Sequence, residues 1–253
     1  MKKSIKEIEA EILNCRDRAE RLALFSTYRE DDRKGVQNLL LKLQKKEEKE
    51  ETEKKRVEDM CFYEKKYASY DLICGIDEAG RGPLAGPVVA GAVILPKDCR
   101  IMYINDSKKL SAKKRDELYD EIMEKAVAVG VGIADHKRID EINILQATYE
   151  AMRAAIASLK TAPQILLNDA VTIPDILLPQ VPIIKGDAKS QSIAAASIIA
   201  KVTRDRLMEA YDAIYPEYGF AGHKGYGAAA HIAAIKKYGP CPIHRKTFIT
   251  HFV

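Results

Sequence analysis

The sequence lacks the features that mark membrane-bound, secreted and zinc-binding proteins. No apolar run approaches the ~20 residues that a membrane-spanning helix needs, and the charged, amphipathic start has no apolar core of a signal peptide. The five cysteines are scattered and form no Cys-x-x-Cys pair, which argues against a disulfide framework and against a zinc knuckle. We therefore expect a cytoplasmic protein that makes no contact with a membrane.

A strong charge of either sign is also missing. The 41 Lys and Arg and the 37 Asp and Glu leave a net charge of +4 with His neutral, so the chain is no bulk polycation. If it binds nucleic acid, its basic residues must be clustered rather than numerous. Hydrophobic residues make up 47% and charged residues 31%, the balance of a folded globular protein. A length of 253 residues is enough for one large α/β domain, or for one domain with a small appendage.

The character of the sequence changes about a quarter of the way along the chain. Before this point the pattern is helical, and Ser4 and Glu7 have the spacing of a capping box. Residues 44–64 are dense in Lys and Glu, which is typical of a solvated helix face. We predict that residues 1–70 form a small helical N-terminal extension and that residues 71–253 form the main domain.

In the second region, short apolar runs alternate with helical patterns. The runs predict strands at residues 72–76, 88–95, 126–134, 164–167 and 181–184. Amphipathic or small-residue periodicity predicts helices at residues 111–125, 141–160, 190–214 and 228–237. Strands that alternate with helices indicate an α/β fold with a central sheet flanked by helices.

Carboxylates follow three of the predicted strands: Asp77 and Glu78 after the first, Asp169 after the fourth and Asp187 just past the fifth. Taken alone, Asp187 is better explained as a helix cap. Successive strand side chains face opposite ways, so Asp77 and Glu78 can share a site only if the strand ends or twists there. The Gly-Arg-Gly that follows favours such a break. If these strand ends meet at one edge of the sheet, four carboxylates gather there.

A cluster made only of carboxylates favours a hard divalent cation. Like charges raise one another's pKa values unless a cation compensates them. Mg²⁺ and Mn²⁺ take carboxylate oxygens, whereas zinc favours nitrogen and sulfur ligands. Two such ions about 4 Å apart can activate a water and stabilise the leaving oxygen of a phosphodiester. The spacing alone does not decide the matter, because any α/β protein has acids at strand ends.

A glycine-rich loop and three basic clusters complete the candidate features. The loop at residues 80–87 is no Walker loop, because no Gly-Lys-Ser/Thr ends it. It is either a tight turn between strands or a place where backbone N–H groups approach a ligand. Basic residues gather within residues 108–115, 201–206 and 223–246. Such groups suit a phosphate track, although each alone is more often a solvated face.

Five strings stand in a specific order between residues 72 and 249. They are residues 75–88 (GIDEAGRGPLAGPV), 106–110 (DSKKL), 185–205 (KGDAKSQSIAAASIIAKVTRD), 223–227 (HKGYG) and 243–248 (IHRKTF). Together they closely resemble the motifs of ribonuclease HII, the bacterial type 2 ribonuclease H. The resemblance implies a ribonuclease-H-like mixed central sheet flanked by helices. It also implies an endonuclease that hydrolyses the RNA strand of RNA/DNA hybrids and cuts 5′ of single ribonucleotides embedded in duplex DNA.

The resemblance assigns the metal-binding residues. The family uses four carboxylates to hold two Mg²⁺ or Mn²⁺ ions, and by motif these are Asp77, Glu78, Asp169 and Asp187. The string around Asp169 is short and variable in the family, and Asp175 lies nearby as a competitor. The position at a strand end favours Asp169.

The resemblance also assigns substrate contacts. The family's Gly-Arg-Gly backbone contacts the 2′-hydroxyl at the cut, the group that separates RNA from DNA, and a tyrosine stacks on the neighbouring sugar. The matching substrate-binding residues are Gly80, Arg81, Gly82, Lys108, Lys109, Ser190 and Tyr226. Ribonuclease HIII carries Gly-Thr-Gly in this place, so the arginine supports cleavage at single-ribonucleotide junctions that leaves a 5′-phosphate. The chain departs from the family at Ala228, where a hydroxyl residue is usual.

Two alternatives stay open. A hybrid-binding protein that has lost catalysis would fit the same motifs, although the presence of all four carboxylates argues against it. Residues 1–70 could be a structural cap or a segment that grips the substrate. We expect a monomer whose partner is nucleic acid.

Overall fold

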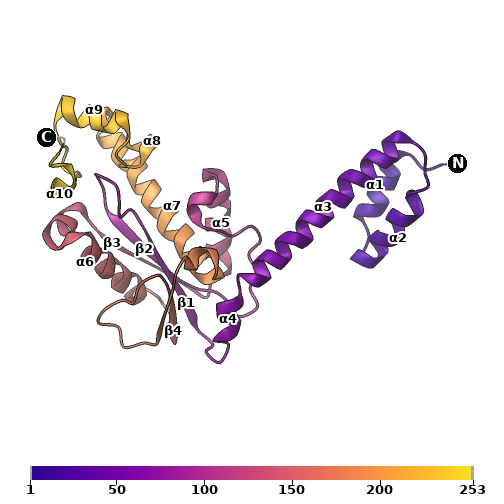
Figure 1. The fold of residues 1–253 in the computed structure, drawn as a ribbon, viewed down its shortest axis with the longest axis horizontal. Coiled ribbons are helices and arrows are strands. Elements are labelled where there is room, and N and C mark those ends of the chain that lie inside the picture. Colours follow the sequence, from indigo (N-terminus) through magenta and orange to yellow (C-terminus); the bar gives the residue numbers. More distant parts are fainter. Residues whose placement is uncertain (1, 252–253) are drawn as a thin grey trace. The chain divides into compact units, whose positions relative to one another are not determined.

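The computed structural model describes residues 2–251, and the chain divides into two compact units, residues 1–56 and residues 57–253 (Figure 1). The helix α3 (Lys34–Asp59) belongs to both units. No helix within residues 2–251 is long and apolar enough to cross a membrane.

The first unit is helical and has its own small core. It contains α1 (Ile5–Leu13), α2 (Arg18–Tyr28) and most of α3. The predicted capping box is confirmed, since the Glu7 N–H donates to Ser4 Oγ (3.3 Å) and the Ser4 N–H donates to Glu7 Oε2 (2.7 Å). The three helices bury Ile8, Ile12, Phe25, Val36, Leu39, Leu40 and Leu43.

The second unit is built on a five-stranded sheet. Its strands are β1 (Ile73–Ala79), β2 (Val88–Ile94), β3 (Ala128–Ala134), β4 (Ile165–Asp169) and β5 (Gln180–Ile183), in the order β3-β2-β1-β4-β5. The hairpin-like strands β1, β2 and β3 pair antiparallel, whereas β4 runs parallel to β1 and β5. All five predicted strands are present, and the predicted mixed sheet is confirmed.

Helices cover both faces of this sheet (Figure 1). On one face α6 (His136–Ala157) packs on β2 and β3. On the other, α7 (Gln191–Ile214) packs on β1 and β2, beside α5 (Ala112–Lys125). The shorter helices are α4 (Phe62–Lys66), α8 (Phe220–His223), α9 (Ala229–Tyr238) and α10 (Lys246–Ile249), with 3₁₀ turns η1 (Ser107–Lys109), η2 (Gly186–Ala188) and η3 (Pro216–Tyr218).

Two boundaries differ from the sequence-based expectation. Helix α6 begins earlier, where Asp135 accepts a hydrogen bond from the Arg138 N–H (2.8 Å), and a kink at Asn143 (φ 69°) interrupts its periodicity. Strand β1 does not end at the first carboxylates, because its antiparallel pairing continues with Asp77 opposite Gly91 and Glu78 opposite Ala90. The strand ends at Ala79, directly before Gly80, so the break lies one residue beyond the two carboxylates.

Close contact between α7 and the sheet depends on strand glycines. A Cβ built on Gly75 would lie 2.1 Å from the main-chain carbon of Ser192, and one on Gly91 would lie 2.4 Å from the Ala196 carbonyl oxygen. Backbone atoms cannot move aside as a side-chain tip can. The close packing of α7 against β1 and β2 therefore requires glycine at these two positions.

The variant Gly75→Ala should lower the free energy of unfolding by about 1–3 kcal/mol, because the added methyl overfills the β1–α7 contact. Urea unfolding measures the effect. The control Gly222→Ala adds a methyl in the helix α8 where no neighbouring element lies within 4 Å, and its stability should not fall, because alanine favours a helix more than glycine does. Equal stability of the two variants would contradict the packing argument.

Candidate active site

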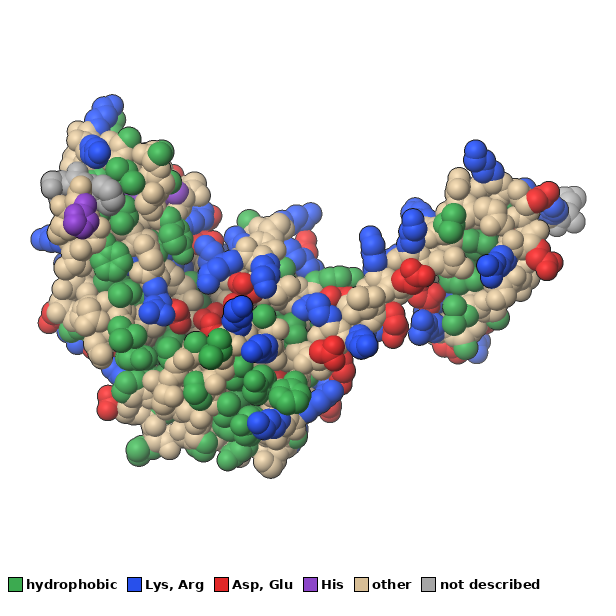
Figure 2. Space-filling model, in the orientation of Figure 1, with side chains coloured by type: hydrophobic (Ala, Val, Ile, Leu, Met, Phe, Trp, Pro, Cys, Tyr) green, Lys and Arg blue, Asp and Glu red, His purple; other side chains and the backbone are tan. Residues whose placement is uncertain are grey.

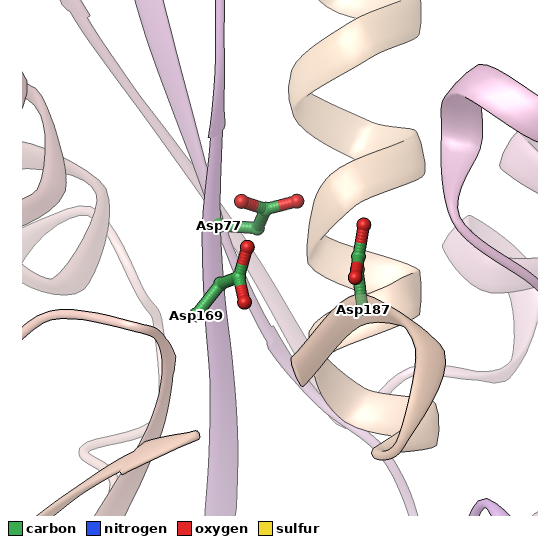
Figure 3. A group of neighbouring side chains, drawn as sticks. All are labelled: Asp77, Asp169 and Asp187. Atoms are coloured by element: carbon green, nitrogen blue, oxygen red, sulfur yellow. The ribbon is translucent and has the colours of Figure 1, made fainter. Parts of the chain in front are cut away.

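Three carboxylates meet where β1, β4 and η2 converge. Asp77 lies on β1, Asp169 is the last residue of β4 and Asp187 lies in η2, just before α7. One carboxylate oxygen of each lies within 4.8 Å of the others (Figure 3). The parallel register, which pairs Ile76 with Asn168, places Asp77 beside Asp169.

Local hydrogen bonds fix this arrangement. The Gly186 N–H donates to Asp169 Oδ1 (2.7 Å), which ties the η2 turn to the end of β4. The capping explanation for Asp187 is wrong, because the N-cap of α7 is Ser190, whose side chain accepts from the Ile193 N–H (3.3 Å). The competitor Asp175 has a side chain 83% exposed that pairs with an arginine, away from the group.

The carboxylates are held in a setting that disfavours their charge. Burial raises the pKa of Asp77 well above its usual value, and the charge of Glu78 raises it further. Burial, followed by the charges of Asp106 and Asp169, raises the pKa of Asp187 to about 6. A divalent cation would remove this repulsion, and carboxylate oxygens are the donors that hard cations take. The residues present therefore fit a divalent metal.

Three neighbours of the cluster were missed by the sequence argument. The Ser197 hydroxyl on α7 hydrogen-bonds Asp77 and lies 3.0 Å from the hydroxyl of Ser107 in η1. Asp106, the N-cap of η1, lies close to Asp187, and its charge contributes to the raised pKa of that carboxyl. Two signals were available: the motif at residues 106–110 contains Asp106 and Ser107, and Ser197 is a polar residue within an Ala- and Ile-rich helix. These contacts join the 106–110 segment to the acidic cluster.

Glu78 lies outside the group of three. Neighbouring strand residues point to opposite sides, and Glu78 Oε1 instead lies 3.5 Å from Arg81 Nη1. Burial raises the pKa of Glu78; Arg81 lowers it and the charge of Asp169 raises it. Because the charge of Asp169 affects the pKa of Glu78, the Glu78 carboxylate still lies near the cluster.

Glu78 opens onto a pocket of about 940 Å³. The lining includes Gly80, Arg81, Gly82, Ser107, Lys108, Arg115, Lys201, Tyr226 and Phe248. On the face shown in Figure 2, Lys and Arg side chains gather beside carboxylates in the hollow between the part that carries α9 and the part that carries α5. A polyanion would find both cations and candidate metal ligands there.

Most of the expected substrate-binding residues line this pocket. Tyr226 stands beside the glycine loop, since a Cβ on Gly82 would lie 3.8 Å from its ring. Lys108 faces the acidic cluster: burial lowers its pKa, but the charges of Asp77 and its neighbours outweigh this and raise it. Lys109 is exposed and lies outside the lining.

Ser190 is not placed as expected. It is fully buried, and its hydroxyl donates to Glu64 Oε1 (2.6 Å). Glu64 Oε1 also accepts from the Ser192 N–H (2.9 Å), and the Gln191 N–H donates to the Met60 carbonyl (3.1 Å). Its place is therefore the N-terminus of α7, where it fastens residues 60–64 to the helix.

The basic clusters are also divided differently from the expectation. Arg204 and Arg245 are buried and donate to main-chain carbonyls, so neither belongs to a surface phosphate track. Lys201 does line the pocket, paired with Asp205 (2.6 Å). Sequence spacing cannot separate these cases, because burial is decided by which elements pack against the helix.

Comparisons with known proteins place the chain in a family. The family model described as Ribonuclease HII matches residues 74–251, and the one described as Ribonuclease HII N-terminal domain matches residues 4–68. The chain belongs to the ribonuclease HII family. Like that family, it is a hydrolase of the ribonuclease H type, an endonuclease that acts on nucleic acid and depends on divalent metal ions.

Individual ribonuclease HII proteins are similar over most of the chain. The protein from Lachnoclostridium phytofermentans is 66% identical over 222 residues, which is 88% of this chain and 87% of that protein. The one from Clostridioides difficile is 53% identical over 253 residues, 99% of each chain. Among solved structures, the ribonuclease H2 from Pyrococcus horikoshii OT3 has a TM-score of 0.58 at 31% identity, covering 70% of this chain and 93% of that chain.

In this ribonuclease HII, a chain of neutral histidines supports the tyrosine of the pocket. The Cys241 N–H donates to His244 Nδ1 (2.9 Å), so the ring proton of neutral His244 lies on Nε2, which is 3.0 Å from His231 Nε2. His231 Nδ1 then donates to the Tyr226 carbonyl (2.8 Å). A second proton on His244 would place its Nδ1–H opposite the Cys241 N–H, and a second proton on His231 would place its Nε2–H opposite the His244 Nε2–H. Burial, followed by His231, lowers the pKa of His244 to about 4.

The histidine chain predicts a loss of stability in mild acid. An unfolded histidine takes up its proton near pH 6.5, whereas folded His244 does so near pH 4. In this window the unfolded state binds more protons at this residue, so His244 by itself should lower the free energy of unfolding by up to about 2 kcal/mol between pH 6.5 and 5. The raised pKa values of Asp77 and Asp187 act in the opposite direction, because there the folded state binds more protons, so the contribution of His244 is measured as a difference between variants. Urea unfolding at pH 7.5 and 5.0, with chelator present, measures it.

The variant His244→Gln isolates the contribution. Compared with the wild type, this variant should be relatively more stable at pH 5.0 than at pH 7.5, whereas the exposed control His251→Gln should keep the pH dependence of the wild type. An unchanged pH dependence in His244→Gln would rule out this histidine as the cause.

Proposed function

We propose that this ribonuclease HII hydrolyses the RNA strand of RNA/DNA hybrids and cuts 5′ of single ribonucleotides embedded in duplex DNA. The observation that carries the proposal is the meeting of Asp77, Asp169 and Asp187 beside a pocket framed by the Gly-Arg-Gly loop and Tyr226. Such a pocket places the candidate metal ligands and the loop that would recognise a ribose next to the same segment of a nucleic-acid strand.

Asp77, Glu78, Asp169 and Asp187 would hold two Mn²⁺ or Mg²⁺ ions. Bound ions of this kind activate an attacking water and stabilise the leaving oxygen of a phosphodiester. Ser197 and the Gly186 N–H orient two of the carboxylates, and the raised pKa values of Asp77 and Asp187 supply the reason for taking up cations. Glu78, displaced toward the pocket, would complete the ligand set from its open side.

The backbone of Gly80, Arg81 and Gly82 would read the 2′-hydroxyl, and Tyr226 would stack on the neighbouring sugar. Their adjacency supports this, because the Leu84 N–H donates to the Gly225 carbonyl (2.8 Å) and so joins the two loops. Lys108 and Lys109 would contact flanking phosphates. Cleavage on the 5′ side of the ribonucleotide leaves a 5′-phosphate.

We further propose that residues 71–253 carry catalysis and that residues 1–70 add grip on the substrate. The protein would act as a monomer in the cytoplasm, in ribonucleotide removal and RNA primer removal. A related protein has been solved in another state, as the PCNA:RNase HII complex from Archaeoglobus fulgidus (TM-score 0.56, 28% identity, 69% of this chain and 93% of that chain).

The variant Asp77→Asn should abolish cleavage of a duplex with one embedded ribonucleotide, with Mn²⁺ or Mg²⁺ present, while duplex binding stays largely intact. The reason is loss of the most buried carboxylate of the cluster. Gel mapping of the cut and fluorescence anisotropy measure the two properties. The control Asp175→Asn removes an exposed carboxylate and should cut normally. Wild-type rates in Asp77→Asn, or cleavage that persists in EDTA, would overturn the metal assignment.

Deletion of residues 1–56 should raise KM and leave kcat unchanged if the extension grips the substrate. The cut is placed here so that Met60 and Glu64 keep their contacts with the start of α7. Steady-state kinetics on the single-ribonucleotide duplex measure both constants. An unchanged KM would leave residues 1–56 without a role in binding.

A further inference from the structure

Two buried arginines stand directly behind the glycine loop. Arg204 on α7 and Arg245 before α10 are 1% and 0% exposed. Within residues 2–251 no carboxylate lies within 4 Å of either guanidinium. A buried charge without a counter-charge is costly, so these two guanidiniums need other hydrogen-bond acceptors in the fold.

Arg245 satisfies main-chain carbonyls of the loop. Its Nε donates to the Gly86 carbonyl (2.9 Å) and its Nη1 to that of Arg81 (2.8 Å). Its Nη2 donates to the carbonyls of Gly80 (2.6 Å) and Pro87 (3.2 Å). One planar group therefore gathers carbonyls from both ends of the loop. Charge-assisted bonds in a fixed fork are the strong kind, and a lysine ammonium cannot reproduce that fork.

Arg204 completes the same scaffold from the α7 side. It donates to the carbonyls of Pro87 (2.9 Å), Ala85 (3.1 Å) and Lys224 (3.0 Å). A Cβ on Gly80, whose φ is +96°, would lie 2.1 Å from Arg204 Nε. The glycine is therefore required both by its backbone conformation and by the arginine behind it.

The consequence concerns the opposite side of the loop. The Leu84 and Gly86 N–H groups donate to the carbonyls of Gly225 (2.8 Å) and Ile243 (2.9 Å). No main-chain acceptor within residues 2–251 takes the amides of Arg81 and Gly82. A trans peptide places its N–H opposite its C=O, so the Arg81 and Gly82 N–H groups point away from the guanidinium that holds the Gly80 and Arg81 carbonyls. Both residues line the pocket.

We propose that Arg245, backed by Arg204, is a positioning residue for ribose recognition. It acts through the carbonyls of Gly80 and Arg81 and makes no contact with the substrate itself. This inference rests on the proposed reading of the 2′-hydroxyl by the loop backbone. It assigns a residue about 160 positions away in the chain to the choice between ribose and deoxyribose.

The test measures sugar preference rather than rate. In an Asp77→Asn background, which prevents cleavage, the affinity for a duplex with one ribonucleotide is compared with that for the all-DNA duplex of the same sequence. Adding Arg245→Lys should reduce the preference for the ribonucleotide by about tenfold, the loss of about one hydrogen bond. Affinity for the all-DNA duplex should stay the same, because phosphate contacts are untouched.

The matched control is Arg138→Lys, an arginine on α6 that pairs with Glu141 and Glu150. It should leave both affinities unchanged. If the Asp77→Asn protein has no preference for the ribonucleotide, the proposed function fails. If that preference exists and survives Arg245→Lys, the proposed function stands and the positioning role is overturned.

A second measurement covers the case in which Arg245→Lys does not fold. Hydrogen–deuterium exchange of the wild type, without nucleic acid, should show slow exchange of the Leu84 and Gly86 amides, because both are hydrogen-bonded to the carbonyls of Gly225 and Ile243 in a loop that is formed in advance. Exchange of these amides at unfolded-chain rates would mean that no preformed loop exists, and the inference would fall.

Discussion

Repulsion between closely placed carboxylates is the constraint on which the rest of the catalytic unit depends. Asp77 and Asp169 are forced together by the parallel pairing of β1 and β4, and Asp187 is added by a turn whose Gly186 N–H is bonded to Asp169. The strand pairing and the turn hold the three carboxylates close together against their repulsion. The close packing of α7 against Gly75 and Gly91 provides the rigidity that is needed to hold the carboxylates in place. The protein thus sacrifices stability at one point to keep a cation-binding geometry ready.

The pocket is assembled from segments that are distant in the chain. The glycine loop follows β1, yet its partners are Gly225, Ile243 and Arg245 from the last part of the described chain. The histidine pair behind Tyr226 belongs to the same C-terminal segment. The loop that would recognise the sugar is therefore held by the C-terminal segment, whereas the acidic cluster is held by the sheet and the turn before α7.

Much of this could be predicted from the sequence, because hydrophobic periodicity reflects local geometry. The strands, the long helices and the strand-end position of Asp169 followed from it, and the motifs supplied the family. What could not be predicted depends on tertiary packing. Ser190, Arg204 and Arg245 resemble surface residues in the sequence, and only the elements packed over them make them buried. The continuation of β1 through Glu78 likewise depends on its partner strand, whose register no local pattern reveals.

The bond between Glu64 and Ser190 has a consequence for building chimeras. Residues 60–64 are fastened to the start of α7, three positions after Asp187, although they continue the chain of the N-terminal helices. An exchange of N-terminal extensions between relatives must therefore join the two parts inside α3, ahead of Met60. A junction after Glu64 would replace Met60 and Glu64 with residues of the relative, and their hydrogen bonds to the start of α7, next to the turn that carries Asp187, could be lost.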